Sequence, residues 1–395
     1  MGRICITGLG VISAIGNTVA KNRLSLIEGK CGISYLDMLA SKFATVLPFG
    51  EIKMSNIFLK KKLNSHETGN TRTNLLALHA IEEAIADSRL TQTQVSSNDT
   101  ALISANTVGG MCMTDEMYYD CKSDAGATEY ISSYDFASVN IFLQKRFKLT
   151  GIINTINTAC SSSANAIMYG ARLIKNGLVK RAVVGGVDSL AKFTINGFNA
   201  LHILSPEPCA PFDENRKGLN LGEGAAFLIL EKEEDVADKK VYATISGYCN
   251  ANDAFHASSL SDEGKGPYHA MKGALQSAGL KPDKIDFINA HGTGTENNDK
   301  VESIAMLRLF DNVPAFASTK SNIGHTLGAA GAIEAVYCIL SLSEQELYPD
   351  LNFKQPIELT KLKPLQEYKK TKLSHIMSNS FGFGGNCTSL IFSTI

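Results

Sequence analysis

Short apolar runs alternate along the chain with longer stretches in which apolar residues recur every three to four positions. The short runs predict β-strands and the longer stretches predict α-helices. This alternation is typical of an α/β protein with parallel or mixed sheets. The predicted strands span residues 3–6, 101–104, 152–156, 182–184, 226–230, 242–247, 285–289, 315–317, 376–379 and 390–392.

Two of the predicted helices share one pattern. The spacing i, i+3, i+4, i+7, which marks a buried helical face, occurs after Cys160 and again after His325. The residues are Ala164, Ile167, Met168 and Ala171 in the first helix, and Ala329, Ala332, Ile333 and Val336 in the second. The repeat predicts two related halves. A charge-dense segment at 231–240 places their boundary so that the halves span residues 1–240 and 241–395.

The N-terminal strand is expected to enter a tight turn at Gly8. The sequence Gly8-Leu9-Gly10 after a strand is also the beginning of a dinucleotide-binding loop. Ser13, however, stands where that loop needs a third glycine or alanine. We therefore do not expect a dinucleotide site here.

Composition narrows the class of protein. The chain has 395 residues, which suffices for two domains, and its 38 basic and 39 acidic side chains nearly cancel. A net charge of −1 gives no global attraction to nucleic acid or to an anionic membrane. No apolar run approaches the roughly 20 residues that span a bilayer, and no signal-peptide pattern opens the chain. Nine scattered cysteines without a Cys-x-x-Cys pair argue against disulfides and zinc, and favour a reducing cytoplasm.

Cys160 is the first candidate for chemistry. It lies in residues 158–163 (Thr-Ala-Cys-Ser-Ser-Ser), at the predicted first turn of a helix. The helix dipole and the free backbone amides of such a turn are expected to favour the thiolate. The same amides are suited to bind an oxyanion that forms at an attached thioester. From this residue alone, a catalytic thiol and a small buried hydrophobe remain equally open.

Two histidines are candidate partners of Cys160. His291 ends a predicted strand and begins the segment His-Gly-Thr-Gly-Thr at 291–295, whose glycines permit close approach of a ligand. His325 begins a helix, where the dipole disfavours a cationic imidazole, so it is able to donate one hydrogen bond and accept another. The histidines at 66, 79, 202 and 375 are interpreted as structural.

Two further segments complete the candidate site. Residues 381–385 (Phe-Gly-Phe-Gly-Gly) follow a predicted strand and form either a hairpin loop or a gate whose amide joins an oxyanion hole. Asp299 and Glu302 lie three residues apart on the helix after His291. They suggest a metal site or, as the preferred reading, acidic side chains that pair with cations such as Lys320.

Together these motifs resemble the β-ketoacyl-acyl carrier protein synthases of the elongating class, within the thiolase-like superfamily. The match covers essentially the whole chain and is specific because its short motifs occur jointly in the family's order. They are residues 6–10 (Ile-Thr-Gly-Leu-Gly), 158–163, 211–213 (Pro-Phe-Asp), 222–224 (Gly-Glu-Gly), 291–295, 319–326 and 379–385.

The resemblance implies a thiolase-like fold, with two similar α/β halves in a five-layered α-β-α-β-α arrangement, usually as a homodimer. It implies catalytic roles for Cys160, His291, His325 and Lys320. The amides of Cys160 and Phe383 would form the oxyanion hole. Phe383, next to Phe381, would be the gate. The supporting residues would be Asp299, Glu302, Thr293, Thr295 and Gly384.

The implied reaction is the decarboxylative Claisen condensation of malonyl-carrier protein with an acyl group held on Cys160. The implied partner is an acyl carrier protein, whose phosphopantetheine carries the substrates, and no metal or redox cofactor is expected. Lys60, Lys61, Lys62, Lys145 and Arg146 are candidate docking residues for this anionic partner. The motifs favour a polyketide or polyene pathway, whereas the length favours fatty acid synthesis.

One departure from the family pattern leaves alternatives open. Asn386-Cys387 stands where the family commonly has Thr-Asn, and Cys387 invites comparison with thiolases that act on coenzyme A thioesters. Thiolases lack the second histidine that His325 supplies, and initiating synthases carry asparagine in place of one histidine. A non-catalytic partner subunit of a heterodimer would lack the nucleophile. A heterodimer in which this chain is the active subunit remains open.

Overall fold

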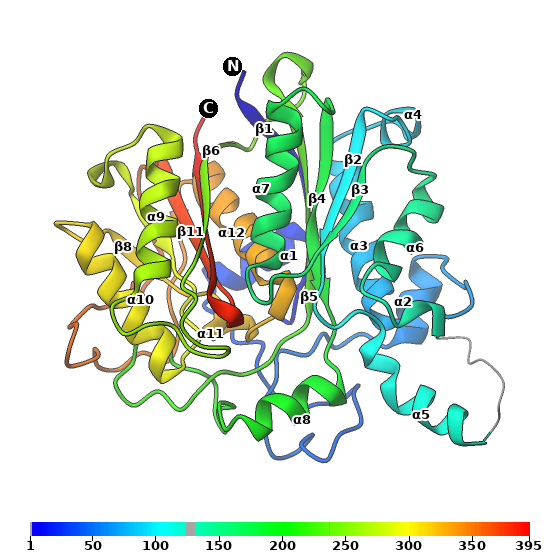
Figure 1. Ribbon diagram of the computed structural model, residues 1–395, viewed down its shortest axis with the longest axis horizontal. Coiled ribbons are helices and arrows are strands. Elements are labelled where there is room, and N and C mark those ends of the chain that lie inside the picture. The colour runs from blue at the N-terminus through cyan, green and yellow to red at the C-terminus, as the bar shows by residue number, and fades with distance from the viewer. Residues whose placement is uncertain (1, 124–130, 237) are drawn as a thin grey trace.

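The computed structural model describes residues 2–123, 131–236 and 238–395 (Figure 1). Ten strands form one sheet in the order β3-β2-β4-β5-β1-β6-β12-β11-β7-β8. Each contains part or all of one predicted strand, so all ten predictions are confirmed. The strands are β1 (Ile4–Ile12), β2 (Thr100–Ala105), β3 (Ile153–Ile156), β4 (Arg181–Asp188), β5 (Gly224–Lys232), β6 (Ala243–Asn252), β7 (Phe287–Asn289), β8 (Ala315–Ala317), β11 (His375–Phe381) and β12 (Asn386–Ser393).

The sheet repeats one topology twice. In each half, the five strands in chain order are arranged third-second-fourth-fifth-first. In both halves the second strand pairs in parallel with the third and the fourth, and the fifth pairs antiparallel with the fourth and the first. The halves meet where β1 pairs with β6 over three residue pairs. The two similar halves are thereby confirmed. The boundary at residue 240 stays a prediction and falls between β5 and β6.

Helices complete five layers (Figure 1). The central layer holds α7 (Ser162–Lys175) and α12 (Ala330–Glu344), one from each half. One outer layer contains α3 (Arg72–Asp87) and α6 (Ser138–Phe147), and the other contains α9 (Lys265–Ala278) and α10 (Glu296–Leu309). Further helices are α1 (Val19–Ile27), α2 (Asn56–Lys62), α4 (Gln92–Val95), α5 (Thr114–Ser123), α8 (Lys192–Ala200) and α11 (Lys320–Ile323). The five-layered thiolase-like fold is confirmed.

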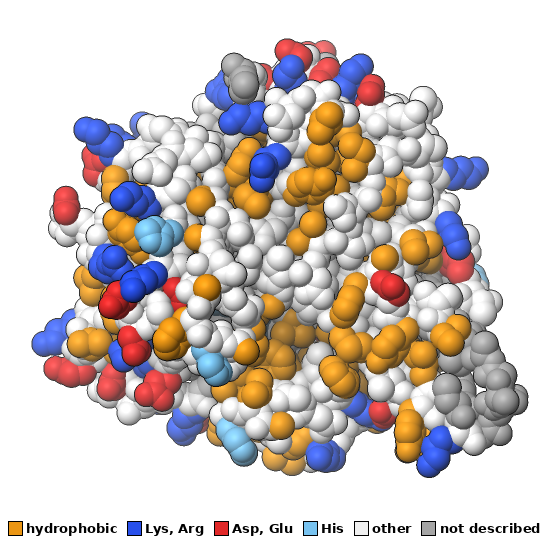
Figure 2. Space-filling view, in the orientation of Figure 1, with side chains coloured by type: hydrophobic (Ala, Val, Ile, Leu, Met, Phe, Trp, Pro, Cys, Tyr) orange, Lys and Arg blue, Asp and Glu red, His pale blue; other side chains and the backbone are white. Residues whose placement is uncertain are grey.

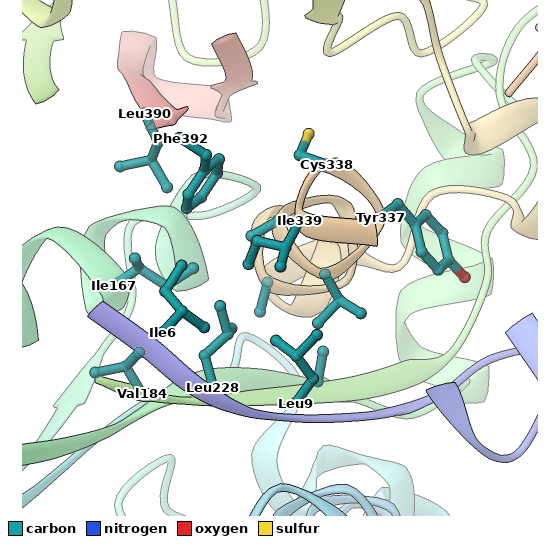
Figure 3. Close-up of a cluster of buried hydrophobic side chains, with 14 of the residues drawn as sticks. Ile6, Leu9, Ile167, Val184, Leu228, Tyr337, Cys338, Ile339, Leu390 and Phe392 are labelled. Atoms are coloured by element: carbon teal, nitrogen blue, oxygen red, sulfur yellow. The ribbon is translucent and has the colours of Figure 1, made fainter. Parts of the chain in front are cut away.

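The largest apolar cluster surrounds the central helices. In Figure 3, Ile339 of α12 and Ile167 of α7 lie over the side chains of Ile6 and Leu228 from the sheet. One stretch of the described chain, Leu327–Glu344, has the length and hydropathy of a membrane-crossing helix, and 89% of it is buried inside the protein. Its apolar character is explained by its place between the two halves of the sheet.

The glycines near the N-terminus have a packing role. β1 continues through Gly8 to Ile12, with only a register shift after Ile6, so the predicted tight turn is wrong. A Cβ atom on Gly10 would overlap the carbonyl oxygen of Ala80, and one on Gly8 would overlap that of Ala84. The backbone of β1 therefore lies directly against the backbone of α3, which requires residues without a side chain.

We predict that Gly10→Ala lowers the stability of the protein by about 1–3 kcal/mol, because the added methyl group has to displace helix backbone. The measurement is the midpoint of thermal or urea unfolding. Gly197→Ala in α8 is the matched control: apart from the adjacent residues and the backbone of the helix itself, no atom of the described residues lies within 4 Å of the added Cβ, and alanine has a higher helix propensity than glycine. Equal midpoints for Gly10→Ala and the wild type would contradict this account of β1.

Candidate active site

Cys160 lies in the connection between β3 and α7. Ala159 before it has a φ of 53°, a left-handed conformation that turns the chain sharply. The helix itself begins at Ser162, so Cys160 stands just before the helix and not in its first turn as predicted. The Cys160 side chain is buried, with 6% of its surface exposed. A buried cysteine directly after a residue in a strained backbone conformation is a typical arrangement for a reactive group.

His291 and His325 converge on Cys160 from the other half. His291 follows β7 after one intervening residue, and His325 follows α11. Their ring centroids are 5.4 Å apart in an edge-to-face arrangement, and a ligand atom of each ring lies within 4.8 Å of the other and of the Cys160 sulfur. The structure therefore brings together the three side chains that the sequence singled out. Both rings are buried.

The hydrogen bonds of the two rings fix their tautomers. The Lys320 ammonium lies 3.3 Å from Nδ1 of His291, and the Leu327 amide donates to Nδ1 of His325 at 3.1 Å. Since both Nδ1 atoms accept, the proton of each neutral ring resides on Nε2. Burial lowers the pKa of both imidazoles well below its usual value, and the Lys320 charge lowers it further. Nε2 of His325 is buried without a partner among the described residues.

This arrangement presents two neutral N–H donors to the cavity. The three atoms are also close enough together to hold a metal ion. A metal ligand, however, has to offer a lone pair, and the lone pairs of both rings are directed at Lys320 and Leu327. The pair of donors is better suited to a carbonyl oxygen on which negative charge develops.

Lys320 is held by Glu334 of α12, and this corrects a prediction. The two side chains form a buried ion pair, and the ammonium also donates to the backbone oxygen of His291 at 2.6 Å. Within the described ranges, neither Asp299 nor Glu302 pairs with Lys320. Glu334 was missed, although it is the only charged residue between positions 327 and 343. A single carboxylate in an apolar helix needs a buried partner, so the position of Glu334 in the sequence already indicated a buried ion pair.

Asp299 and Glu302 instead shape the loop around His291. Glu302 accepts hydrogen bonds from the amides of His291 and Gly292, each at 2.9 Å. Asp299 accepts from the amides of Gly294 and Phe212. Burial raises the pKa of both carboxyls, that of Glu302 to about 7, against the opposing effect of these amides. Both acids therefore act on the backbone of the loop. Asp299 also lies 3.9 Å from the Arg216 guanidinium, so the predicted pairing with a cation is confirmed for Asp299, although the cation is not Lys320.

A cavity of about 470 Å³ opens onto Cys160. It is lined by the two histidines and by Thr293, Thr295 and Phe381 among others. Figure 2 shows a hollow with apolar side chains on this face, above α8. The docking candidates Lys60, Lys61, Lys62, Lys145 and Arg146 end α2 and α6, and none of them is among the described lining residues.

The turn between β11 and β12 carries Phe383 into this cavity. The Phe383 ring stacks on Phe198 of α8, with centroids 5.9 Å apart and planes 13° apart. Gly384 has a φ of 80° and is exposed, and its amide donates to Ala257 at 2.8 Å. Both readings of residues 381–385 are therefore compatible: the segment is a hairpin turn, and it also covers the site.

Burial and the surrounding amides have opposite effects on the acidity of the Cys160 thiol. Burial raises its pKa to about 11, although the amide of Phe383, the charge of Lys320 and its own amide favour the thiolate. The predicted effect of the backbone amides is therefore present, but desolvation of the anion outweighs it. The two amides that favour the anion are those the family resemblance assigned to the oxyanion hole.

The departure at Asn386-Cys387 leaves the site intact. Oδ1 of Asn386 accepts hydrogen bonds from Ser161, Asn165 and Asn250 at 2.7–2.9 Å, which ties the turn to the start of α7. Cys387 is fully buried, its thiol lies 3.4 Å from the Gly385 oxygen, and it is not among the described residues that line the cavity.

Comparisons with known proteins agree with this geometry. Residues 1–236 match the model of the β-ketoacyl synthase N-terminal domain, and residues 242–354 match that of the C-terminal domain. The 3-oxoacyl-[acyl-carrier-protein] synthase 2 of Coxiella burnetii is 32% identical over 412 residues, which cover 100% of this chain and 99% of that protein. The chain therefore belongs to the β-ketoacyl synthase family, and it is an acyl-transferring condensing enzyme.

Two solved structures are similar over the whole chain. The ishigamide ketosynthase/chain length factor matches with a TM-score of 0.94 at 25% identity, covering 100% of this chain and 99% of that one. The ketosynthase ApeO in complex with its chain length factor ApeC, from Xenorhabdus doucetiae, matches with a TM-score of 0.89 at 32% identity, covering 100% and 98%. The fold expected from the motifs is thus the fold of ketosynthases.

We predict that alkylation of Cys160 by iodoacetamide accelerates about tenfold per pH unit from pH 7 to at least pH 9, because the thiolate fraction rises up to the high pKa. Peptide mass mapping isolates this site from the other cysteines, and Cys160→Ala is the blank. Lys320→Met should lower the rate of Cys160 alkylation below that of the wild type, since it removes a cation that favours the thiolate. A rate that levels off below pH 9 would contradict the burial argument.

Proposed function

We propose that this protein catalyses the decarboxylative condensation of malonyl-carrier protein with an acyl group carried on Cys160, in fatty acid or polyketide-type synthesis. The observation that carries the proposal is the convergence of one thiol and two neutral N–H donors, those of His291 and His325, in one cavity. A thiol alone supports acyl transfer. Two donors beside it add a place where enolate charge is stabilised.

In the first step Cys160 accepts the acyl group. Its sulfur attacks the thioester carbonyl of the acyl-carrier protein, and the amides of Cys160 and Phe383 bind the oxyanion. The carrier leaves as a free thiol with the proton that Cys160 gives up. Because the free thiol is weakly acidic, this proton leaves in the course of the attack and not beforehand.

In the second step malonyl-carrier protein enters the same cavity. Its thioester carbonyl accepts hydrogen bonds from Nε2 of His291 and Nε2 of His325. Loss of carbon dioxide places negative charge on that oxygen, opposite donors that are already oriented. The resulting carbanion attacks the acyl-Cys160 thioester. The product is two carbons longer, and the Cys160 thiolate is released and takes up a proton.

The surrounding residues have supporting roles in this proposal. Lys320 and Glu334 hold His291, while Asp299 and Glu302 hold the loop that carries Thr293 and Thr295. Phe383 acts as a gate, because its ring stacks on Phe198 in the wall of the cavity and belongs to a turn in which Gly384 has a positive φ. We propose no metal or redox cofactor, since no step requires one. A reducing compartment such as the cytoplasm suits the reactive thiol.

An acyl carrier protein is the proposed partner. The names of the 3-oxoacyl-[acyl-carrier-protein] synthases to which the chain is similar support this proposal. A partner subunit is the second candidate, because the similar chains in two solved structures belong to assemblies of a ketosynthase with a chain length factor. Cys160 and both histidines support a catalytic role for this chain in either assembly.

The function is tested with purified protein, acyl-carrier protein and malonyl-carrier protein. We expect the acyl mass on Cys160 after the first addition and a β-ketoacyl product two carbons longer after the second, both read by intact-protein mass spectrometry. Cys160→Ala should give neither. An acyl group on another residue, or extension from the coenzyme A thioester but not from the carrier thioester, would rule out the proposed function.

We further propose a homodimer that forms through the edge of the sheet. β3 pairs only with β2 among the described strands, so its outer edge offers unpaired backbone groups. Ile152, Phe136 and Ile141 beside it are exposed apolar side chains. An exposed strand edge with an apolar surround fits a second copy of the same edge.

We predict a particle of twice the chain mass in light scattering coupled to size exclusion. Ile152→Asp should shift it to the monomer, because the same charge is buried twice across a symmetric contact. Leu359→Asp, which places the same charge on a more exposed apolar residue away from β3, should leave the dimer intact. A monomeric wild type, or a dimer only in the presence of a different subunit, would contradict the homodimer.

A further inference from the structure

Asp188 is a buried carboxylate that none of the steps above uses. It ends β4 in the N-terminal half and has no exposed surface. Oδ1 accepts hydrogen bonds from the amides of Thr107 and Val108 at 2.9 and 2.8 Å. Oδ2 accepts from the Thr107 hydroxyl and from the amide of Gly328, both at 2.7 Å. One side chain thus joins a loop of the first half to the start of α12 in the second half.

The Gly328 contact lies directly beside the catalytic machinery. Leu327, the preceding residue, donates its amide to Nδ1 of His325 at 3.1 Å, and this bond sets the tautomer of the ring. Leu327 has a φ of 52°, a left-handed conformation that costs about 1–3 kcal/mol for a residue with a side chain. A turn in this conformation persists only where its neighbours hold it.

Gly328 fits this interpretation. A Cβ atom at this position would lie 2.8 Å from Oδ2 of Asp188 and 2.9 Å from the Thr107 side chain. The glycine therefore permits the close approach of the carboxylate to the backbone of the turn. Burial raises the pKa of Asp188 to about 6 against the opposing effect of its donors, so the group is mainly ionised at neutral pH and accepts from all of them.

We propose that Asp188 is a positioning residue: it anchors the turn at Leu327-Gly328 so that the Leu327 amide keeps the His325 proton on Nε2, facing the cavity. The inference rests on the proposed function. Without the anchor the turn is free to relax, the proton is free to move to Nδ1, and Nε2 would then present a lone pair to the malonyl oxygen. An acceptor in that place opposes the charge that decarboxylation creates.

The negative charge of Asp188 disfavours the Cys160 thiolate, whereas its hydrogen bonds support the arrangement of His325. It raises the pKa of that thiol, so the carboxylate is adverse to the nucleophile and favourable only to the arrangement of His325. Loss of Asp188 should therefore separate the two partial reactions. A residue that served folding alone would affect both reactions to the same extent.

Asp188→Asn keeps the shape of the side chain but replaces one carboxylate oxygen, a hydrogen-bond acceptor, by an NH2 group, which is a donor. Because hydrogen-bond donors face both oxygens of Asp188, this NH2 group is placed against a donor on either side. We expect decarboxylation of malonyl-carrier protein to fall about tenfold or more, toward the rate of His325→Ala. Acyl transfer to Cys160 should stay within about twofold, and alkylation of Cys160 should not slow. Both partial reactions are followed by intact-protein mass spectrometry of carrier and enzyme.

Glu231→Gln is the matched control. Glu231 is a fully buried carboxylate that accepts from Thr7 and Lys239 and pairs with Arg181 at the opposite end of β4. Its loss should leave the ratio of the two partial reactions at the wild-type value. If Asp188→Asn does not fold, Gly328→Ala disturbs the same contact from the other side and should change the ratio in the same direction.

The tautomer provides a direct readout. In long-range proton–nitrogen spectra of ¹⁵N-histidine-labelled protein, assigned with His325→Ala, we expect the proton of His325 on Nε2 in the wild type and a mixture in Asp188→Asn. An unchanged tautomer, or an equal loss of both partial reactions, would overturn the role of Asp188. A wild type that fails to decarboxylate malonyl-carrier protein would instead overturn the proposed function, while the tautomer still tests the anchor.

Discussion

The buried ion pair of Lys320 and Glu334 is the interaction on which the rest of the site depends. Both side chains are about 2% exposed, so neither charge is stabilised by water. Removal of one partner from such a pair typically costs about 3–5 kcal/mol, because the other charge remains buried. The pair is also directional. It holds the Lys320 ammonium against both Nδ1 and the backbone oxygen of His291, which fixes where that imidazole points and which nitrogen carries its proton.

The two-fold repeat of the fold explains why such a site forms where it does. Each half contributes one helix to the central layer, and each of these helices is preceded by a residue that faces the cavity, Cys160 in one half and His325 in the other. Cys160 and the two histidine donors thus come from different halves. Their mutual distances are set by the packing of α7 against α12 and by carboxylates at the junction. No single half contains the complete site.

Much of this organisation was predictable because the signals for it lie in short, contiguous stretches of the sequence. Strand positions follow from short apolar runs, and the family motifs that contain Cys160, His291 and His325 are contiguous. The contacts that order the site are not local. Glu334 reaches Lys320 across 14 positions, and Asp188 reaches Gly328 across 140. The amides that favour the Cys160 thiolate were predictable because a helix start is visible in sequence, whereas the burial that opposes them depends on both halves.

The glycines at the beginning of the chain also depend on a contact with residues that are distant in the sequence. The sequence Gly8-Leu9-Gly10 was expected to turn, since glycines after a short apolar run commonly do. Their function is to admit the backbone of α3, and the helix that makes this necessary begins more than sixty residues later. A pattern of glycines predicts that something approaches closely. It does not predict what approaches.

The close contact between the central helices also has a consequence for synthesis on the ribosome. A Cβ atom on Gly331 of α12 would lie 2.8 Å from the amide of Ala164 of α7, so the two helices meet almost backbone to backbone. The first half of the chain leaves the ribosome with α7 already made and with the apolar face that α12 will cover still uncovered. That face stays exposed until the second half has been translated. This architecture therefore requires that the nascent first half be protected from aggregation until the second half has been made.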